Sequence, residues 1–129
     1  METRSIDTNV LIRGALKGKT EQHRKARRVF QEHTIYITDT VLLESFWVLR
    51  NVHEMDLNEI YDCFKKLTRL RNADIESRSA LIRAIKLAEA GLGFADAFHL
   101  AKSRPYEMVT FDQKFAKRGK REGEAIALL

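Results

Sequence analysis

Four acidic residues lie in stretches of the chain where most neighbouring residues are apolar. They are Asp7 after Ser5-Ile6, Glu44 within residues 41–49, Asp96 within residues 93–101, and Asp112 after residues 109–111. An ionised carboxylate in an apolar setting is costly unless it is paired, protonated or bound to a cation. If the four lie close together, each pair would repel by ~4 kcal/mol at a separation of ~4 Å and an effective dielectric of ~20. Carboxylate oxygens suit hard divalent cations such as Mg²⁺ or Mn²⁺, so these acids are candidates for a metal site.

Each acid also has a structural explanation when it is taken alone. Asp7 and Asp112 stand between a strand and a helix, where Asp often caps the helix. Asp96 lies near a helix start, where the macrodipole favours a negative charge, and Glu44 could form a buried salt bridge. His99, one turn after Asp96, is interpreted as a core or hydrogen-bonding residue. Because the set contains no Cys and only this one nearby imidazole, zinc is a poor fit.

The segments that must position these acids alternate between strand and helix patterns. Helices are expected over residues 21–32, 41–49, 56–67, 77–88, 94–102 and 113–118 (closed by Gly119), with another opening at Val10; strands are expected over residues 34–38, 107–111 and 125–129 and just before Asp7. The alternation predicts an α/β fold, a three-layer α/β/α sandwich around a central, mainly parallel sheet, in a single domain over residues 1–129. Functional residues of such sheets gather at the carboxyl ends of the strands, which favours Asp7, Asp39 and Asp112.

The helix over residues 41–49 is apolar nearly all round. We therefore expect it to be buried on several sides. Asp39 or Thr40 is the expected cap at its start. Trp47 is interpreted as a core residue, although a place in a dimer or partner groove is the alternative.

The composition describes a globular chain with a basic surface. Hydrophobic residues make up 44% and charged residues 32% of its 129 residues, and 23 Lys and Arg against 18 Asp and Glu give a net charge of +5. A basic balance favours a polyanionic partner. The single cysteine, Cys63, excludes an internal disulfide and suits a cytoplasmic protein. No apolar run approaches the ~18 residues of a membrane span, and the first residues do not resemble a signal peptide.

Basic residues gather in two parts of the chain. One group follows Asp112 directly and is a candidate for contact with an RNA backbone: Lys114, Lys117, Arg118, Lys120 and Arg121. The other group is Arg24, Lys25, Arg27 and Arg28, for which a solvated helix face is an equally good interpretation.

The acids lie in short motifs that together resemble one family. The motifs are Ile6-Asp7-Thr8-Asn9-Val10-Leu11, Leu43-Glu44, Phe94-Ala95-Asp96-Ala97, and Thr110-Phe111-Asp112 with Phe115. In their order and spacing they resemble the PIN-domain family, and most closely the VapC-type toxin ribonucleases of type II toxin–antitoxin systems. Residues 51–78 contain no motif of that family.

The resemblance implies a Mg²⁺- or Mn²⁺-dependent endoribonuclease that hydrolyses RNA phosphodiester bonds. It assigns Asp7 and Asp96 to the principal metal, with Glu44 and Asp112 completing its surroundings. Asn9 and Thr110 match polar positions that support the acids: both are therefore candidate supporting residues. The same resemblance implies a cognate antitoxin protein as a partner, and we also expect a homodimer and no membrane association.

Two other classes of function remain open at this stage. The chain could be a non-catalytic PIN-like module that binds RNA or protein, in which case the acids are caps and salt bridges. Another phosphate-handling α/β domain ranks lower. A receiver domain needs an acid pair after its first strand, but Asp7 is followed by Thr8 and Asn9. A dehalogenase-type phosphatase needs a second Asp two residues after the first, and Asn9 occupies that place. No P-loop motif is present.

Overall fold

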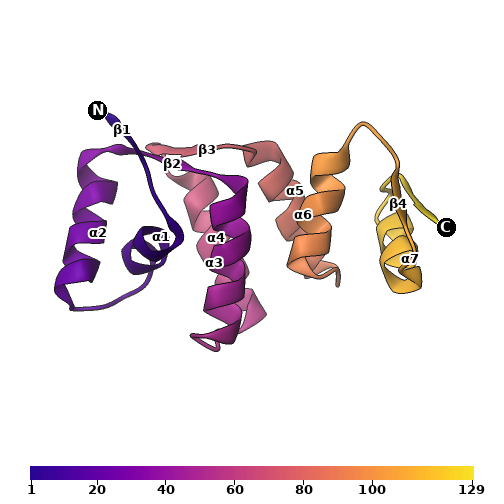
Figure 1. The fold of residues 1–129 in the computed structure, drawn as a ribbon, viewed down its shortest axis with the longest axis horizontal. Helices are drawn as coiled ribbons and strands as arrows, with labels where there is room; N and C mark the ends of the chain where they lie inside the picture. Colours follow the sequence, from indigo (N-terminus) through magenta and orange to yellow (C-terminus); the bar gives the residue numbers. More distant parts are fainter. The chain divides into compact units, whose positions relative to one another are not determined.

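The computed structural model describes all 129 residues, and the chain forms two compact units, Met1–Arg78 and Ser79–Leu129 (Figure 1). The first unit contains β1 (Thr3–Ser5), α1 (Thr8–Ala15), α2 (Glu21–Glu32), β2 (Thr34–Ile37), α3 (Asp39–Asn51), α4 (Leu57–Arg69) and β3 (Ala73–Ile75). The second contains α5 (Arg78–Glu89, beginning at the boundary), α6 (Phe94–Ser103), β4 (Met108–Thr110), α7 (Gln113–Arg121) and β5 (Ile126–Leu128). The predicted α/β class is confirmed. No helix has the length and apolar character needed to cross a membrane.

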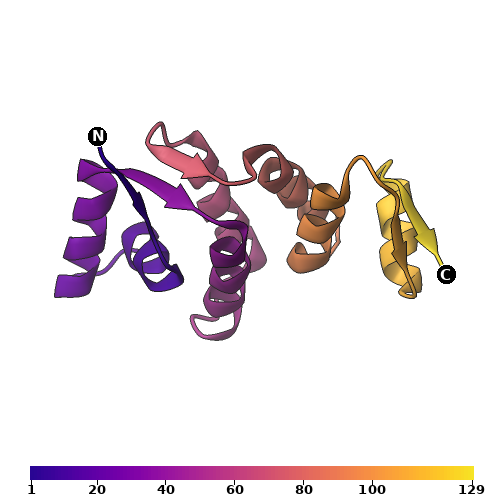
Figure 2. The ribbon, with the colours of Figure 1, turned by 45° about the horizontal axis from the view of Figure 1, so that its top comes forward.

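The first unit is built on a three-stranded parallel sheet in the order β1-β2-β3. Figure 2 shows the three strands pointing the same way. Its central strand is the most buried, because Ile35 and Ile37 are fully enclosed. β3 was not expected from the sequence: with three residues it is too short to show a strand period. Since the strands are parallel, the residues that follow them all lie at the carboxyl edge of this sheet.

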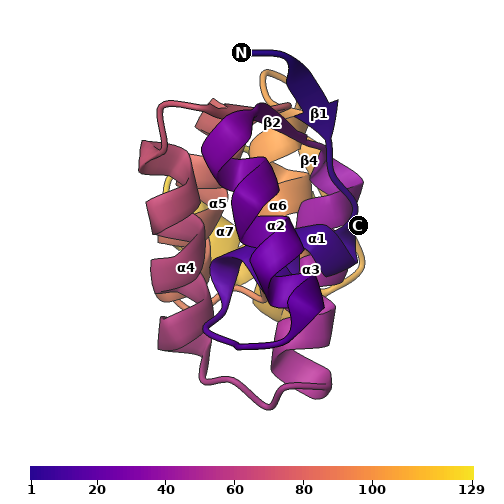
Figure 3. The ribbon, with the colours of Figure 1, turned by 90° about the vertical axis from the view of Figure 1, so that its left-hand side faces the viewer.

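α3 leads away from the sheet and α4 returns to it (Figure 3). The two helices are in contact, and the rings of Phe46 and Tyr61 stack between them with centroids 6.2 Å apart. Fully buried Leu42, Ile60 and Phe64 complete this part of the core. Burial of each such side chain contributes ~1.5–3 kcal/mol to folding.

Two predictions about α3 are wrong. Its cap is Thr38, whose hydroxyl accepts a hydrogen bond from the Val41 N–H at 3.3 Å, rather than Asp39 or Thr40. The helix is also not buried on several sides: only one stripe is enclosed, and Trp47 is 60% exposed and outside the core. An apolar composition does not by itself supply neighbours for every face of a helix.

The second unit contains a β4–α7–β5 segment in which the two strands pair in parallel. α7 does not end before Gly119 as predicted but continues to Arg121. Gly119 is needed for close packing, because a Cβ there would lie 2.9 Å from Cγ2 of Ile126 and 3.1 Å from Cδ2 of Leu100. The turn comes later, at Gly123, where φ is +78°.

A buried carboxylate ties this segment to the two helices before it. Glu124 is only 7% exposed. It accepts hydrogen bonds from Arg104 Nη2 at 2.8 Å and from Arg83 Nε at 3.2 Å. Burial raises the pKa of Glu124, but the hydrogen bonds and charges of Arg104 and Arg83 outweigh it, so that the pKa lies below its ordinary value of 4.5. Glu124 thus connects α5, the end of α6 and the start of β5.

We expect Glu124→Gln to lower the free energy of unfolding by about 2–3 kcal/mol at neutral pH, because hydrogen bonds to a charged group are lost. A group with a lowered folded pKa stabilises the fold fully above its unfolded pKa, and this contribution disappears as the pH falls through the folded pKa. The difference between wild type and variant should therefore shrink below pH 4.5. Urea unfolding over a pH series measures it. Glu122→Gln, which removes the neighbouring carboxylate, is the matched control. Equal stability of Glu124→Gln and wild type at pH 7 would contradict the assignment.

Candidate functional site

Asp7 lies two residues beyond β1 and begins α1. Its backbone is extended, with φ −89° and ψ 178°, and its Oδ1 accepts a hydrogen bond from the Val10 N–H at 3.0 Å. A short acceptor at this position satisfies one of the free N–H groups of the first helical turn. The cap holds this exposed carboxylate at the carboxyl edge of the sheet and uses only its Oδ1.

Glu44 is held by a residue that the sequence did not mark. The hydroxyl of Thr8 donates a hydrogen bond to Oε1 of Glu44, from α1 to α3. Thr8 is 8% exposed, and it follows Asp7 directly. One helix start therefore positions both acids of the first unit. The only sequence signal was the place of Thr8 inside the Asp7-Thr8-Asn9 motif, since its partner lies 36 residues away.

The second unit places its two acids at helix starts as well. Asp96 lies in the first turn of α6, whose cap residue, Gly93, has no side chain to bond the free N–H groups. Asp112 caps α7, where its Oδ1 accepts a hydrogen bond from the Phe115 N–H at 3.0 Å. The hydroxyl of Thr110 accepts a hydrogen bond from the Asp112 N–H at 3.0 Å and so fixes the backbone of this cap.

Asp96 and Asp112 line one hollow of about 150 Å³ together with Lys114 and Arg118. Arg118 is anchored there, because its Nη1 donates a hydrogen bond to the Gly91 carbonyl at 2.9 Å. The remaining lining residues are Leu92, Gly93 and Phe115. Two carboxylates and two cations at one hollow provide ligands for a cation beside donors for a phosphate.

The four acids are not in apolar surroundings, and that part of the sequence argument is wrong. Asp7, Glu44, Asp96 and Asp112 are all exposed. On α3 and α6 the buried apolar residues lie on another face than Glu44 and Asp96, because successive helical residues turn by about 100°. His99 is exposed too, which excludes the predicted core position. No Lys or Arg forms an ion pair with any of the four acids.

The side chains of the four acids suit a divalent cation. All four candidates supply carboxylate oxygens, the ligand type that Mg²⁺ and Mn²⁺ prefer, and their charges are not neutralised by basic partners. Neither unit by itself brings together three or more His, Cys, Asp or Glu side chains that could hold a metal ion. Each unit contains two of the four carboxylates, and the carboxylate is a ligand type that suits Mg²⁺ or Mn²⁺.

The other predicted residues have different locations. Asn9 is exposed on α1 and lines a pocket with residues of α2, including Lys25. Lys117, Lys120 and Arg121 are exposed on α7 but do not line the hollow of Asp96 and Asp112. Of the five basic residues predicted near Asp112, the structure places two beside it.

Acids at the ends of β2 and β3 form a further cluster that the sequence indicated only for Asp39. The Asp39 N–H donates a hydrogen bond to Oε1 of Glu76, and its Oδ2 accepts one from the Ser77 hydroxyl, both at 3.0 Å. Burial raises the pKa of Tyr36, and the charges of Glu76, Asp74 and Asp39 raise it further. Asp39 is therefore part of the turn structure at this sheet edge.

The comparison with protein families identifies the chain over most of its length. The family model described as the PIN domain matches residues 5–121, which include all four acids. No match was found among the curated proteins.

The caps make a prediction that is independent of any activity. Asp112→Ala should lower the free energy of unfolding by ~1 kcal/mol, whereas Asp112→Asn should keep most of the cap, because an amide oxygen can accept the same hydrogen bond. Urea unfolding and hydrogen exchange of the Phe115 amide measure the effect. Gln113→Ala, at the neighbouring exposed position, is the control. Unchanged Phe115 protection in the Ala variant would show that Asp112 is not the cap.

Proposed function

The chain belongs to the PIN domain family, a nuclease-type fold, and on that basis we propose that it is a Mg²⁺- or Mn²⁺-dependent endoribonuclease. The observation that supports this proposal most is the family match over residues 5–121, a range that contains the four acids assigned to the metal by the resemblance. Proteins of this family typically use divalent metal ions. Hydrolysis of RNA phosphodiester bonds is the reaction that we assign to it.

All four acids serve one metal site in this proposal, so that residues 1–129 work as a single nuclease domain. Asp7 and Asp96 would hold the principal ion, and Glu44 and Asp112 would complete its surroundings. Support comes from their exposure and from the lack of basic partners, because four uncompensated carboxylates favour a divalent cation. When bound, the ion lowers the pKa of a water molecule and stabilises negative charge on the phosphate.

The protein's own side chains supply orientation and charge. The caps made by Asp7 and Asp112 fix the backbone on which two of the acids stand, and Thr8 orients Glu44. Lys114 and Arg118 would bind an RNA phosphate in the hollow beside Asp112. A planar, anchored guanidinium such as that of Arg118 is suited to two parallel hydrogen bonds with phosphate oxygens.

The distribution of charge supports a polyanionic substrate. Residues 13–28 contain seven Lys and Arg against one acid, a net charge of +6, and residues 113–121 contain five against none. The remaining residues must therefore sum to −6, because the whole chain is +5. Much of the positive charge is thus concentrated in α7 and in the segment from the end of α1 through most of α2, where it can follow a phosphate backbone.

We also assign the chain to the toxin component of a toxin–antitoxin pair that acts in the cytoplasm as a homodimer. This rests on the order and spacing of the motifs, which resemble those of VapC-type toxins. Exposed apolar side chains provide surface for a protein partner, since Trp47 on α3 is 60% and Phe111 after β4 is 82% exposed.

RNA cleavage by the purified chain should require Mg²⁺ or Mn²⁺ and stop on addition of EDTA. Asp7→Asn and Asp96→Asn should each reduce the cleavage rate by about 10³-fold or more, because a ligand of the catalytic ion is lost. Gel analysis of total RNA and of defined oligonucleotides measures this, with unfolding curves to show that the variants fold. Asp62→Asn, an exposed acid on α4, is the matched control and should cleave at the wild-type rate. If either site variant cut as fast as wild type, the assignment would fail; if no RNA were cut with either metal, the non-catalytic binding module would be favoured.

The toxin assignment predicts a short reading frame next to this gene whose product binds the chain. Co-expression should yield a stable complex, and light scattering should show two copies of this chain in it. The bound product should suppress cleavage. A tight complex without loss of cleavage, or a strictly monomeric chain in the complex, would contradict this assignment.

A further inference from the structure

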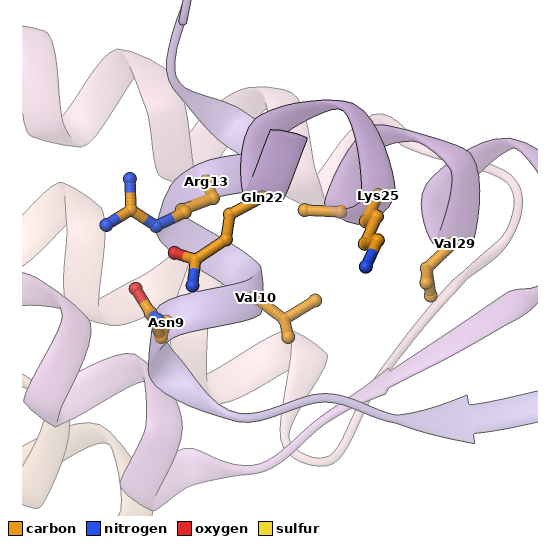
Figure 4. Close-up of a pocket in the computed structure, with 7 residues that line it drawn as sticks. Asn9, Val10, Arg13, Gln22, Lys25 and Val29 are labelled. Carbon is orange, nitrogen blue, oxygen red and sulfur yellow. The ribbon is translucent and has the colours of Figure 1, made fainter. Parts of the chain in front are cut away.

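A pocket of about 230 Å³ lies between α1 and α2 and shares no lining residue with the hollow of Asp96 and Asp112 (Figure 4). Val10, Ala26 and Val29 supply apolar walls. Its polar lining residues are Asn9, Arg13, Gln22 and Lys25, and no acid is among them. Figure 4 shows Asn9, Arg13 and Gln22 gathered at one end of the pocket and Lys25 with Val29 at the other.

Arg13 is a charged group without a partner. Its Nε is buried and makes no hydrogen bond, and the guanidinium forms no ion pair. A buried donor left unpaired is destabilising, and a ligand with a suitable acceptor would relieve this. Lys25 has only a surface pairing with Glu21 at 3.6 Å, which contributes little.

The surroundings of this pocket are positively charged. Burial lowers the pKa of His23 on α2, and the charges of Arg13 and Arg27 lower it further. The nearby segment over residues 13–28 has a net charge of +6. An anion at the pocket would therefore meet an uncompensated positive field.

The combination of apolar walls, amide groups and cations narrows the class of ligand. Pockets of ~300–1,000 Å³ hold drug-sized ligands, so a pocket of about 230 Å³ suits something smaller, such as one nucleobase. The amides of Asn9 and Gln22 offer both donors and acceptors for a base edge. The guanidinium of Arg13 suits a phosphate, which it can bind through two parallel hydrogen bonds.

The pocket also adjoins one of the proposed catalytic acids. A neighbouring hollow of about 340 Å³ is lined by Asp7 and shares Val10 and Val29 with this pocket. Along α1 the distance from Asp7 to Arg13 is six residues, or about 9 Å. A nucleotide in the pocket would thus lie close to, but outside, the position of the bond that is cut.

We propose that the α1–α2 pocket is a nucleotide-binding subsite of the RNA substrate, with Arg13 on a phosphate and the base between Val10, Ala26 and Val29. The inference rests on the proposed action on RNA and extends it by naming a contact that selects the nucleotide next to the cleaved bond. Asn9 is a base-contacting residue in this proposal. It therefore gives the enzyme a means of selecting the RNA sequence that it cleaves.

Binding in EDTA tests the subsite without any cleavage. Arg13→Gln should weaken the binding of a single-stranded RNA by about tenfold, because one phosphate contact is lost. The plot of log binding constant against log salt concentration should also become less steep, by about 0.7 in slope. Arg69→Gln, the same change at an exposed position of α4 that does not line the pocket, should weaken binding by less than threefold. The Arg13 variant should unfold at the same or a higher temperature, since an unpaired buried donor is removed. Equal losses in both variants, or a loss of stability that accounts for the effect, would overturn the proposal.

Nuclear magnetic resonance on the full-length chain separates the base from the phosphate. Nucleoside 5′-monophosphates should shift the signals of Val10, Ala26 and Val29, with one base preferred, whereas inorganic phosphate and ribose 5-phosphate should shift only Arg13. If inorganic phosphate alone caused the same shifts as the nucleoside monophosphates, the pocket would be a site for anions only, and the proposed nucleotide subsite would be wrong. An acidic peptide that binds the pocket as tightly as an RNA of equal charge would overturn it in favour of a protein partner. Because these measurements need no metal, the subsite can fail while metal-dependent cleavage stands, and the reverse.

Discussion

Every helix starts with backbone N–H groups that have no partner within the helix. In this protein three of the helices that follow a strand, α1, α3 and α7, have a side chain that accepts a hydrogen bond from one of these groups. The parallel sheet of β1, β2 and β3 places three strand ends at one edge. At two of the strand-to-helix turns an aspartate, Asp7 or Asp112, caps the next helix, and at a third the cap is Thr38. Two of the four acids that we propose as metal ligands, Asp7 and Asp112, are therefore helix caps as well. The cap fixes the position of each of these carboxylates without a basic partner, which leaves its charge available to a cation.

α1 shows how much one short helix contributes when its start is fixed in this way. Its cap is Asp7, its first residue bonds Glu44 across to α3, and Arg13 two turns later lines the pocket beside α2. The helix packs against both α2 and α3, so that these roles are divided among its faces. Its eight residues thus join the proposed chemistry at one end to the proposed recognition of RNA at the other.

The exposed and the buried carboxylates of the molecule differ in their partners. Exposed carboxylates remain unpaired at the starts of α1, α6 and α7 and on α3, whereas the one deeply buried carboxylate, Glu124, is fully paired with two arginines. This difference follows from solvation: water can stabilise an exposed unpaired acid, but a buried one needs partners in the protein. The buried ion pair therefore reports on folding of the second unit, and the exposed acids are available for function.

The sequence by itself determined the features that depend on neighbouring residues. The helical spacing over residues 21–32 predicted the bounds of α2 correctly, and the motifs around the four acids indicated the family that the match over residues 5–121 confirms. Only the tertiary structure decided the features that depend on distant residues. The bond from Thr8 to Glu44, the close approach of Gly119 to Ile126, the exposure of Trp47 and the unpaired Arg13 all follow from packing between elements far apart in the chain. Periodicity tells which side of a helix is apolar, but what covers that side is set by its neighbours in space.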